Sequence, residues 1–265
     1  LRTWKLIGEK GMSDLQTYLN NPERERVIPQ VREKIDELGV DSIYLQYISI
    51  TGRIMGKTIP SRHWERVAHE GMQTWLGGVT NVFADKEGDL IGFAPNASEL
   101  LALPDPDTFC QLPWNKRIAR VYCTVFFSKE DPDRPEQYLD SDTRGNLRRI
   151  HDQFEKDHGV RMRVGCEPEM LWLKPGDEHK PYYETTKPYA YHVDQFEELS
   201  DVWMRVTDYA SAMGLDMIQG DHEDAPGQIE LNFQYDDALR TSDRLTTYRQ
   251  ICARVAREFD LIAVF

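Results

Sequence analysis

Residues 164–173 read Val-Gly-Cys-Glu-Pro-Glu-Met-Leu-Trp-Leu, and this stretch carries the strongest structural signal in the chain. Apolar residues lead into and out of it, which predicts a core β-strand. Side chains two apart on a strand share one face, so Glu167 and Glu169 would lie together. Like charges on a buried face repel and lose solvation unless something compensates them. A bound Mg²⁺ or Mn²⁺ is one such compensator; a solvated strand is the alternative.

Residues 218–234 form a second acidic element, Ile-Gln-Gly-Asp-His-Glu-Asp-Ala-Pro-Gly-Gln-Ile-Glu-Leu-Asn-Phe-Gln. The Pro-Gly turn at 226–227 and the alternation after it predict a β-hairpin. Glu223 would end the first arm, and Glu230 lies in the second arm between two apolar neighbours. Such a glutamate faces either water, as on an ordinary amphipathic hairpin, or a polar cavity. Two strands that carry glutamates in apolar settings favour a shared metal cavity.

These two motifs resemble the glutamine synthetase superfamily. Residues 165–170 are similar to its Gly-Pro-Glu-Pro-Glu-Phe strand, and residues 222–230 to its His-Glu-x-x-Pro-Gly-Gln-x-Glu hairpin. Upstream, residues 52–60 resemble the hairpin of the family's small N-terminal domain. Residues 98–105 resemble the Ser-Asp-Met-x-Leu-x-Pro-Asp segment that closes that domain. The resemblance covers nearly the whole chain from Asp41 onward and is nearest to the γ-glutamyl amide ligases, those for polyamines, isopropylamine and anilines.

The resemblance implies an α+β fold of two domains. Residues 1–127 would form an N-terminal β-grasp-like domain. Residues 128–265 would form the first part of a glutamine-synthetase-type catalytic domain with a curved antiparallel sheet, incomplete here. The apolar end of the chain reads as a strand that stops, so we expect truncation, with the remaining catalytic residues beyond Phe265.

Composition excludes some classes of partner. A net charge of −13 and an isoelectric point near 5.0 argue against binding to nucleic acid or to an anionic membrane surface. No apolar run approaches the ~20 residues needed to span a bilayer. The four cysteines are scattered, which is typical of reduced thiols in a cytoplasmic protein.

The chemistry implied by the resemblance is the ATP-dependent joining of the γ-carboxylate of L-glutamate to an amine through a γ-glutamyl phosphate. Glu169, Glu223 and Glu230 would hold one Mg²⁺ or Mn²⁺, and Glu167 would help to hold a second ion against the ATP phosphates. Tyr235 falls roughly where the family stacks an aromatic ring near adenine; a packed strand aromatic is the alternative interpretation.

The kind of amine is predicted from a family segment that this chain lacks. Glutamine synthetases carry an Asp-Gly-Ser-Ser segment whose aspartate binds ammonium in the neighbouring subunit's site, and no Asp-Gly-Ser occurs in this chain. Asp85 is the candidate for that role, with Trp75 in the same amine pocket. An organic amine is therefore predicted, with an arylamine slightly favoured. Glutamine synthetase proper, using ammonia, and a non-catalytic metal-binding or oligomeric scaffold are the alternatives.

The resemblance also implies assembly. Similar proteins form homo-oligomers, here a dodecamer of two hexameric rings when full length, with active sites between subunits. Residues 75–89 are therefore expected at a subunit interface.

Overall fold

The helix α2 (Pro22–Leu38) shows how local sequence signals place an element. The side chain of Asn21 accepts from the backbone N–H of Glu23, and a proline occupies the first helical position. The helix ends at Gly39, whose φ of +63° is the left-handed cap that glycine adopts readily. Its buried residues Ile28, Val31 and Ile35 form one stripe that faces the core.

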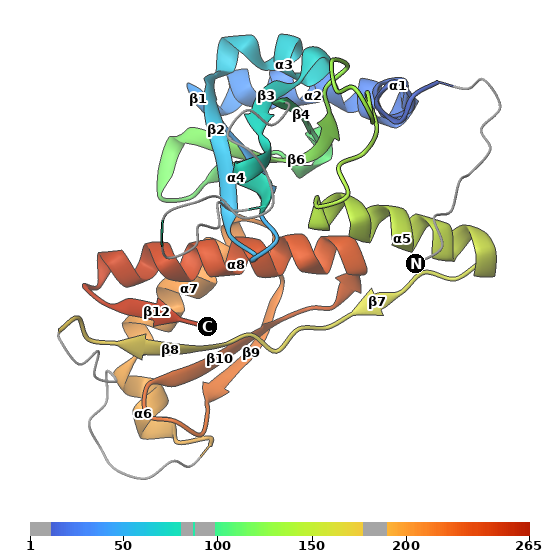
Figure 1. Cartoon of the computed structure of the whole chain (residues 1–265). Coiled ribbons are helices and arrows are strands. Elements are labelled where there is room, and N and C mark those ends of the chain that lie inside the picture. Colours follow the sequence, from blue (N-terminus) through green and yellow to red (C-terminus); the bar gives the residue numbers. More distant parts are fainter. Residues whose placement is uncertain (1–11, 81–86, 88–98, 177–189) are drawn as a thin grey trace. The chain divides into compact units, whose positions relative to one another are not determined.

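A computed structural model describes residues 12–80, 87, 99–176 and 190–265 (Figure 1). The chain divides into two compact units, Leu1–Asn146 and Leu147–Phe265. Among the described residues, no helix combines the length and the hydropathy that a bilayer crossing requires.

Unit 1 is built on a six-stranded mixed sheet. Its path runs in the order β2 (Ile54–Pro60), β1 (Ser42–Ile48), β6 (Asn115–Phe127), β4 (Glu99–Pro104), β3 (Met72–Trp75), and β5 (Cys110–Leu112) pairs with β6. Strand β1 is parallel to β6, and the other pairs are antiparallel. The unit also contains α1 (Asp14–Leu19), η1 (Ser61–His63), α3 (Trp64–Glu70), α4 (Leu76–Thr80) and η2 (Pro106–Thr108).

The core of unit 1 lies between this sheet and the helices α2 and α3. Buried side chains from both helices pack against β1 and β6, with Trp64 of α3 fully buried. The second half of β6 is buried on both faces, which is expected of a central strand and explains its long apolar run.

Residues 129–137, which follow β6, lead back to the sheet, where the backbone N–H of Phe127 donates to the carbonyl of Gln137 at 2.9 Å. The backbone N–H of Leu139 donates to the carbonyl of Val125, and the carboxylate of Asp142 accepts from the Val125 N–H at 2.9 Å. Asp142 also accepts from Gly145 N–H at 3.1 Å and so caps α5 (Thr143–His158). These contacts tie the chain to unit 1, so the structure divides at Asn146, whereas the sequence-based boundary was placed after residue 127.

Unit 2 contains a four-stranded antiparallel sheet in the order β12 (Ile262–Val264), β8 (Glu169–Leu173), β10 (Gln228–Phe233), β9 (Met217–His222). A second, two-stranded antiparallel sheet pairs β7 (Arg163–Val164) with β11 (Asp236–Asp237). In the sequence, β7 precedes β8 and β11 follows β10. Its helices are most of α5, together with α6 (Val193–Glu198), α7 (Ser200–Ala212) and α8 (Ala238–Glu258). The predicted α+β class and the predicted hairpin are both confirmed.

One face of this sheet is apolar and packs on α8. Met170 and Trp172 of β8 are buried on it, together with Phe233 of β10. The hydroxyl of Tyr248 lies 3.3 Å from the sulfur of Met170, and its ring centroid lies 6.2 Å from that of Phe233. Because side chains alternate along a strand, the other face of β8, β9 and β10 carries the polar residues.

The predicted continuous strand over residues 164–173 is wrong in its first half. Residues 165–168 lie between β7 and β8 and belong to no β-strand. Pro168 explains the interruption, because proline has no N–H for a ladder and restricts the residue before it. Glu167 therefore precedes β8, and the period-two argument that joined it to Glu169 does not apply.

Candidate metal centre

Strand pairing brings three carboxylates into one row on the polar face of the unit 2 sheet. Glu169 of β8 is the register partner of Glu230 of β10. Glu230 is in turn the register partner of Asp221 of β9. Directly opposed residues point to the same face, so these three side chains lie side by side across the sheet.

Glu223 completes a cluster with two of them. It follows β9 directly, and its backbone N–H donates to the carbonyl of Gln228 at 2.9 Å, which closes the Pro-Gly hairpin. Carboxylate oxygens of Glu169, Glu223 and Glu230 lie within 4.8 Å of one another. None of these three pairs with a lysine or arginine in the described part of the chain. Three uncompensated oxygen donors at this spacing fit a hard divalent cation.

Two side-chain amides from β10 hold the glutamates of this cluster. Gln228 Nε2 donates to Glu169 Oε2 at 2.5 Å, while Gln228 Oε1 accepts from the Ala225 N–H at 3.1 Å. Asn232 Nδ2 donates to Glu230 Oε1 at 2.6 Å. Hydrogen-bonded carboxylates of this kind keep one orientation, as metal ligands in proteins do.

The electrostatics of the site follow from burial and crowding. Only 7% of Glu230 is exposed, so it does not lie on an ordinary wet hairpin face. Burial raises the pKa of Glu230; the Asn232 amide opposes this, and the nearby Glu223 and Glu167 add to it. Burial also raises the pKa of Asp221, and the negative charge of Glu230 raises it further. The negative charge that crowds these groups is what a bound cation would neutralise.

Comparison with known proteins places this hairpin in a family. Residues 140–265 match the family model described as glutamine synthetase, catalytic domain. This segment, residues 140–265, belongs to the glutamine synthetase family. The resemblance read from the two glutamate motifs is thereby confirmed.

Alignments with individual relatives reach beyond residues 140–265 and cover most of the chain. A glutamine synthetase of Rhizobium meliloti (strain 1021) is 29% identical over 86% of this chain and 49% of its own length. That of Methanocaldococcus jannaschii is 27% identical over 91% of this chain and 52% of its own length. The chain therefore spans about half the length of the curated relatives it matches.

Solved structures agree on the fold. A GmaS/ADP complex superposes with a TM-score of 0.76 at 24% identity, over 89% of this chain and 51% of its own. A ligand-free GmaS gives a TM-score of 0.73 at 26% identity, over 87% of this chain and 51% of its own. The architecture of both units is thus that of glutamine synthetase relatives.

The three-glutamate group does not include the other predicted site residues that the structure describes. Glu167 is outside the three-glutamate group, although its charge contributes to the raised pKa of Glu230, after burial and Glu223. Tyr235 follows β10, is 49% exposed, and has the guanidinium of Arg163 at 4.7 Å from its ring centroid. Trp75 ends β3 in unit 1, with its ring close to Gly77. Asp85 lies outside the described residues.

Sequence reasoning missed two members of the glutamine synthetase hairpin's polar face, Asp221 and Asn232. Each lies two residues from a motif glutamate, Asp221 before Glu223 and Asn232 after Glu230, so period-two geometry could have found both. His222 occupies the opposite face, where it is buried as the register partner of Ile229.

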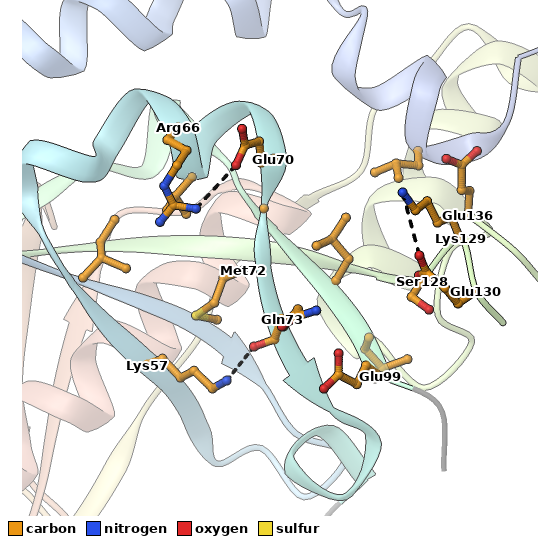
Figure 2. Close-up of a pocket in the computed structure, with 16 residues that line it drawn as sticks. Lys57, Arg66, Glu70, Met72, Gln73, Glu99, Ser128, Lys129, Glu130 and Glu136 are labelled. Atoms are coloured by element: carbon orange, nitrogen blue, oxygen red, sulfur yellow. Dashed lines mark hydrogen bonds and ion pairs between the residues drawn. The ribbon is translucent and has the colours of Figure 1, made fainter. Parts of the chain in front are cut away.

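Unit 1 contains a separate cavity of about 590 Å³ (Figure 2). Its cationic side chains already have acceptors: Lys57 donates to the Gln73 carbonyl at 2.6 Å, and Arg66 faces Glu70 at 3.5 Å. The Lys57 bond also links β2 to β3, the two ends of the sheet path, so the sheet is strongly curved. Acidic residues on its wall make this cavity a poor site for a phosphate group.

Proposed function

We propose that this protein is an ATP-dependent ligase that joins the γ-carboxylate of L-glutamate to an amine. The observation that carries the proposal is the convergence of Glu169, Glu223 and Glu230 in a glutamine synthetase catalytic domain, two of them from the paired strands β8 and β10 and one from the turn after β9. The donor set consists of carboxylates alone, one of them nearly buried, which suits Mg²⁺ or Mn²⁺ and not a softer metal.

The three glutamates would hold one ion, and Glu167 would help to hold a second one beside the ATP phosphates. Bound ions of this charge would stabilise the negative charge that develops on phosphoryl oxygens. The chain's own contribution is fixed geometry: the Gln228 and Asn232 amides keep two of the carboxylates in place. Tyr235 is proposed to stack near adenine.

In the proposed reaction, a γ-carboxylate oxygen of glutamate takes the terminal phosphoryl group of ATP, and ADP is the leaving group. The amine nitrogen then attacks the γ-carbonyl carbon, phosphate leaves, and the nitrogen loses a proton to a base or to water. Ammonia and alkylamines arrive at neutral pH mostly as cations, so their site needs a carboxylate that binds the charge and accepts the proton. Arylamines are weak bases that arrive neutral, so an apolar wall is of more use to them.

An organic amine is the proposed co-substrate, with an arylamine slightly favoured. The missing Asp-Gly-Ser segment and the indole of Trp75 support it. The likeness to GmaS, a γ-glutamylmethylamide synthetase, at 26% identity also supports an organic amine. Ammonia is the second candidate, because the curated relatives are named glutamine synthetase.

Amine selectivity decides between these candidates. We expect phosphate release from ATP by the intact gene product, with glutamate and Mg²⁺, to be at least about 10-fold more efficient with one organic amine than with ammonia. The panel is aniline, methylamine, putrescine and ammonia, compared as kcat/KM. A value for ammonia equal to or above all the others would make the protein a glutamine synthetase, and phosphate release with none would favour a non-catalytic scaffold.

The variant Asp85→Ala sharpens the same assay. If Asp85 accepts the proton of a charged amine, the variant loses about 100-fold or more with methylamine. Its turnover of aniline stays largely intact, because a neutral amine does not need that carboxylate. Equal losses with both amines would contradict the arylamine proposal.

Assembly into rings is the other part of the proposal. A head-to-tail contact of the small domain of one subunit with the large domain of the next closes into rings, and we propose a dodecamer of two hexamers. Residues 75–89 would lie at that contact. Light scattering on the intact gene product is expected to give the mass of such an assembly, and Trp75→Glu to reduce it. A wild-type monomer at micromolar concentration would rule this out.

A further inference from the structure

Asn232 occupies a position that the family motif does not assign. It lies on β10 two residues after Glu230, so both side chains project from the same face of the sheet. Asn232 is 5% exposed, and its Nδ2 lies 2.6 Å from Glu230 Oε1. An ionised carboxylate only accepts hydrogen bonds, so the NH₂ end of the amide must be the end that faces it.

The other end of this amide has no hydrogen-bond partner in the part of the chain that the structure describes. Asn232 Oδ1 is buried and accepts no hydrogen bond from the described residues. Gln228, the matching amide two residues before Glu230, has its oxygen bonded to the Ala225 N–H. A buried acceptor without a donor costs about 1–3 kcal/mol. An apolar side chain of the same shape would avoid that cost, so the asparagine calls for a reason other than packing.

We propose that Asn232 is a positioning residue of the metal centre. Its NH₂ group fixes Glu230 in the orientation in which the carboxylate faces Glu169 and Glu223, and its carbonyl is left open for a water molecule within the site. The proposal rests on the proposed function, because it requires that the three glutamates bind a divalent ion.

Second-sphere amides act in this way because a carboxylate that is already oriented loses less freedom when the ion binds. A charge-assisted bond as short as this one is strong enough to hold a single orientation. The rival explanation is that Asn232 only stabilises the hairpin. The two explanations differ in what happens to the protein when no metal is present.

The test compares Asn232→Leu, which keeps the side-chain shape and removes both polar ends, with the wild-type chain. Mn²⁺ affinity is measured by electron paramagnetic resonance of free Mn²⁺, and Tm is measured in EDTA. We expect the affinity to fall about 10- to 100-fold, while the metal-free Tm changes little, because the lost bond to Glu230 is offset by removal of the buried unpaired carbonyl. Asn232→Ala is expected to weaken Mn²⁺ binding similarly.

Gln219→Met is the matched control. Gln219 is the register partner of Asn232 on the same face, but it is exposed and makes no hydrogen bond to Glu230. It should bind Mn²⁺ as the wild type does. Unchanged affinity in Asn232→Leu overturns the positioning role while the metal centre stands. If Asn232→Leu lowers the metal-free Tm as well as the Mn²⁺ affinity, the positioning role is also overturned, and Asn232 has a structural role instead. A wild-type chain that binds no Mn²⁺ overturns the metal centre itself.

Discussion

Glu230→Gln is expected to lower the affinity of the chain for Mn²⁺ by more than about 100-fold, since loss of a ligand costs more than the 10- to 100-fold typical of its hydrogen-bond partners. The same change is expected to raise the Tm of the metal-free chain. Glu230 is nearly buried beside Glu169 and Glu223 without a cationic partner in the described residues. A glutamine keeps an acceptor for Asn232 and removes the charge.

The pH dependence of this effect has a definite sign. Burial first, then Glu223 and Glu167, raises the pKa of folded Glu230 above its ordinary value of 4.5. The stability that Glu230 contributes is therefore complete below that ordinary value and is lost as pH rises through the raised folded pKa. The Glu230→Gln chain has no ionisable group at this position and does not lose this stability. The difference in metal-free Tm between variant and wild type should therefore grow as pH rises from 4.5 through the raised pKa of Glu230. Mn²⁺ binding shows the opposite trend, because the ion needs the ionised carboxylate.

Titration calorimetry with Mn²⁺ and scanning calorimetry in EDTA measure the two effects. Glu198→Gln is the control, an exposed glutamate of α6 outside the cluster, and it should change neither. A Glu230→Gln chain that binds Mn²⁺ as tightly as the wild type would show that the cluster is not the metal site.

Asp105→Asn is expected to lower the free energy of unfolding of unit 1 by about 3–5 kcal/mol, because it removes one charge of a buried ion pair. The side chains of Asp105 and Arg144 are each 4% exposed and form an ion pair. Asp105 also accepts from the hydroxyl of Tyr18 and lies 3.4 Å from that of Thr124. The Pro-Asp end of the N-terminal motif is thus the centre of a buried polar network.

Urea denaturation of the single and double variants separates the pair from its parts. Replacing both partners, Asp105→Asn with Arg144→Met, should recover much of the loss, since both charges of the pair are then removed together. Glu23→Gln is the control. It removes a partner of Arg26 from a surface pair that is 61% and 75% exposed, and it should cost about 1 kcal/mol or less. A double variant as unstable as the sum of its single variants would show that the pair is not coupled.

Local signals in the chain were sufficient for much of the fold. The cap at Asp142 and the glycine at residue 159 set the two ends of α5, and both are residue types that favour helix ends. Around the Pro-Gly turn, alternation alone required Glu230 to face away from Ile229 and Leu231. The family resemblance carried the same two motifs to a catalytic domain, which the comparison of residues 140–265 confirms.

Local signals failed where a contact across the chain or a single residue overrides the pattern. Pro168 interrupts the strand that apolar flanks predicted, and this separates Glu167 from Glu169. The predicted domain boundary falls after residue 127, yet Leu139 and Asp142 form hydrogen bonds with Val125 that attach the following segment to unit 1. Neither outcome is visible in a window of neighbouring residues.

By itself, the sequence determined which residues have the chemistry and which face of each strand they take, because alternation is a property of the extended backbone. Only the tertiary structure decided that Glu169, Glu230 and Asp221 stand in one row, because register is set when β8, β10 and β9 pair. Burial of Glu230 and Asn232 likewise exists only in the packed sheet. The crowding that makes this hairpin a candidate metal centre is therefore a property of the fold.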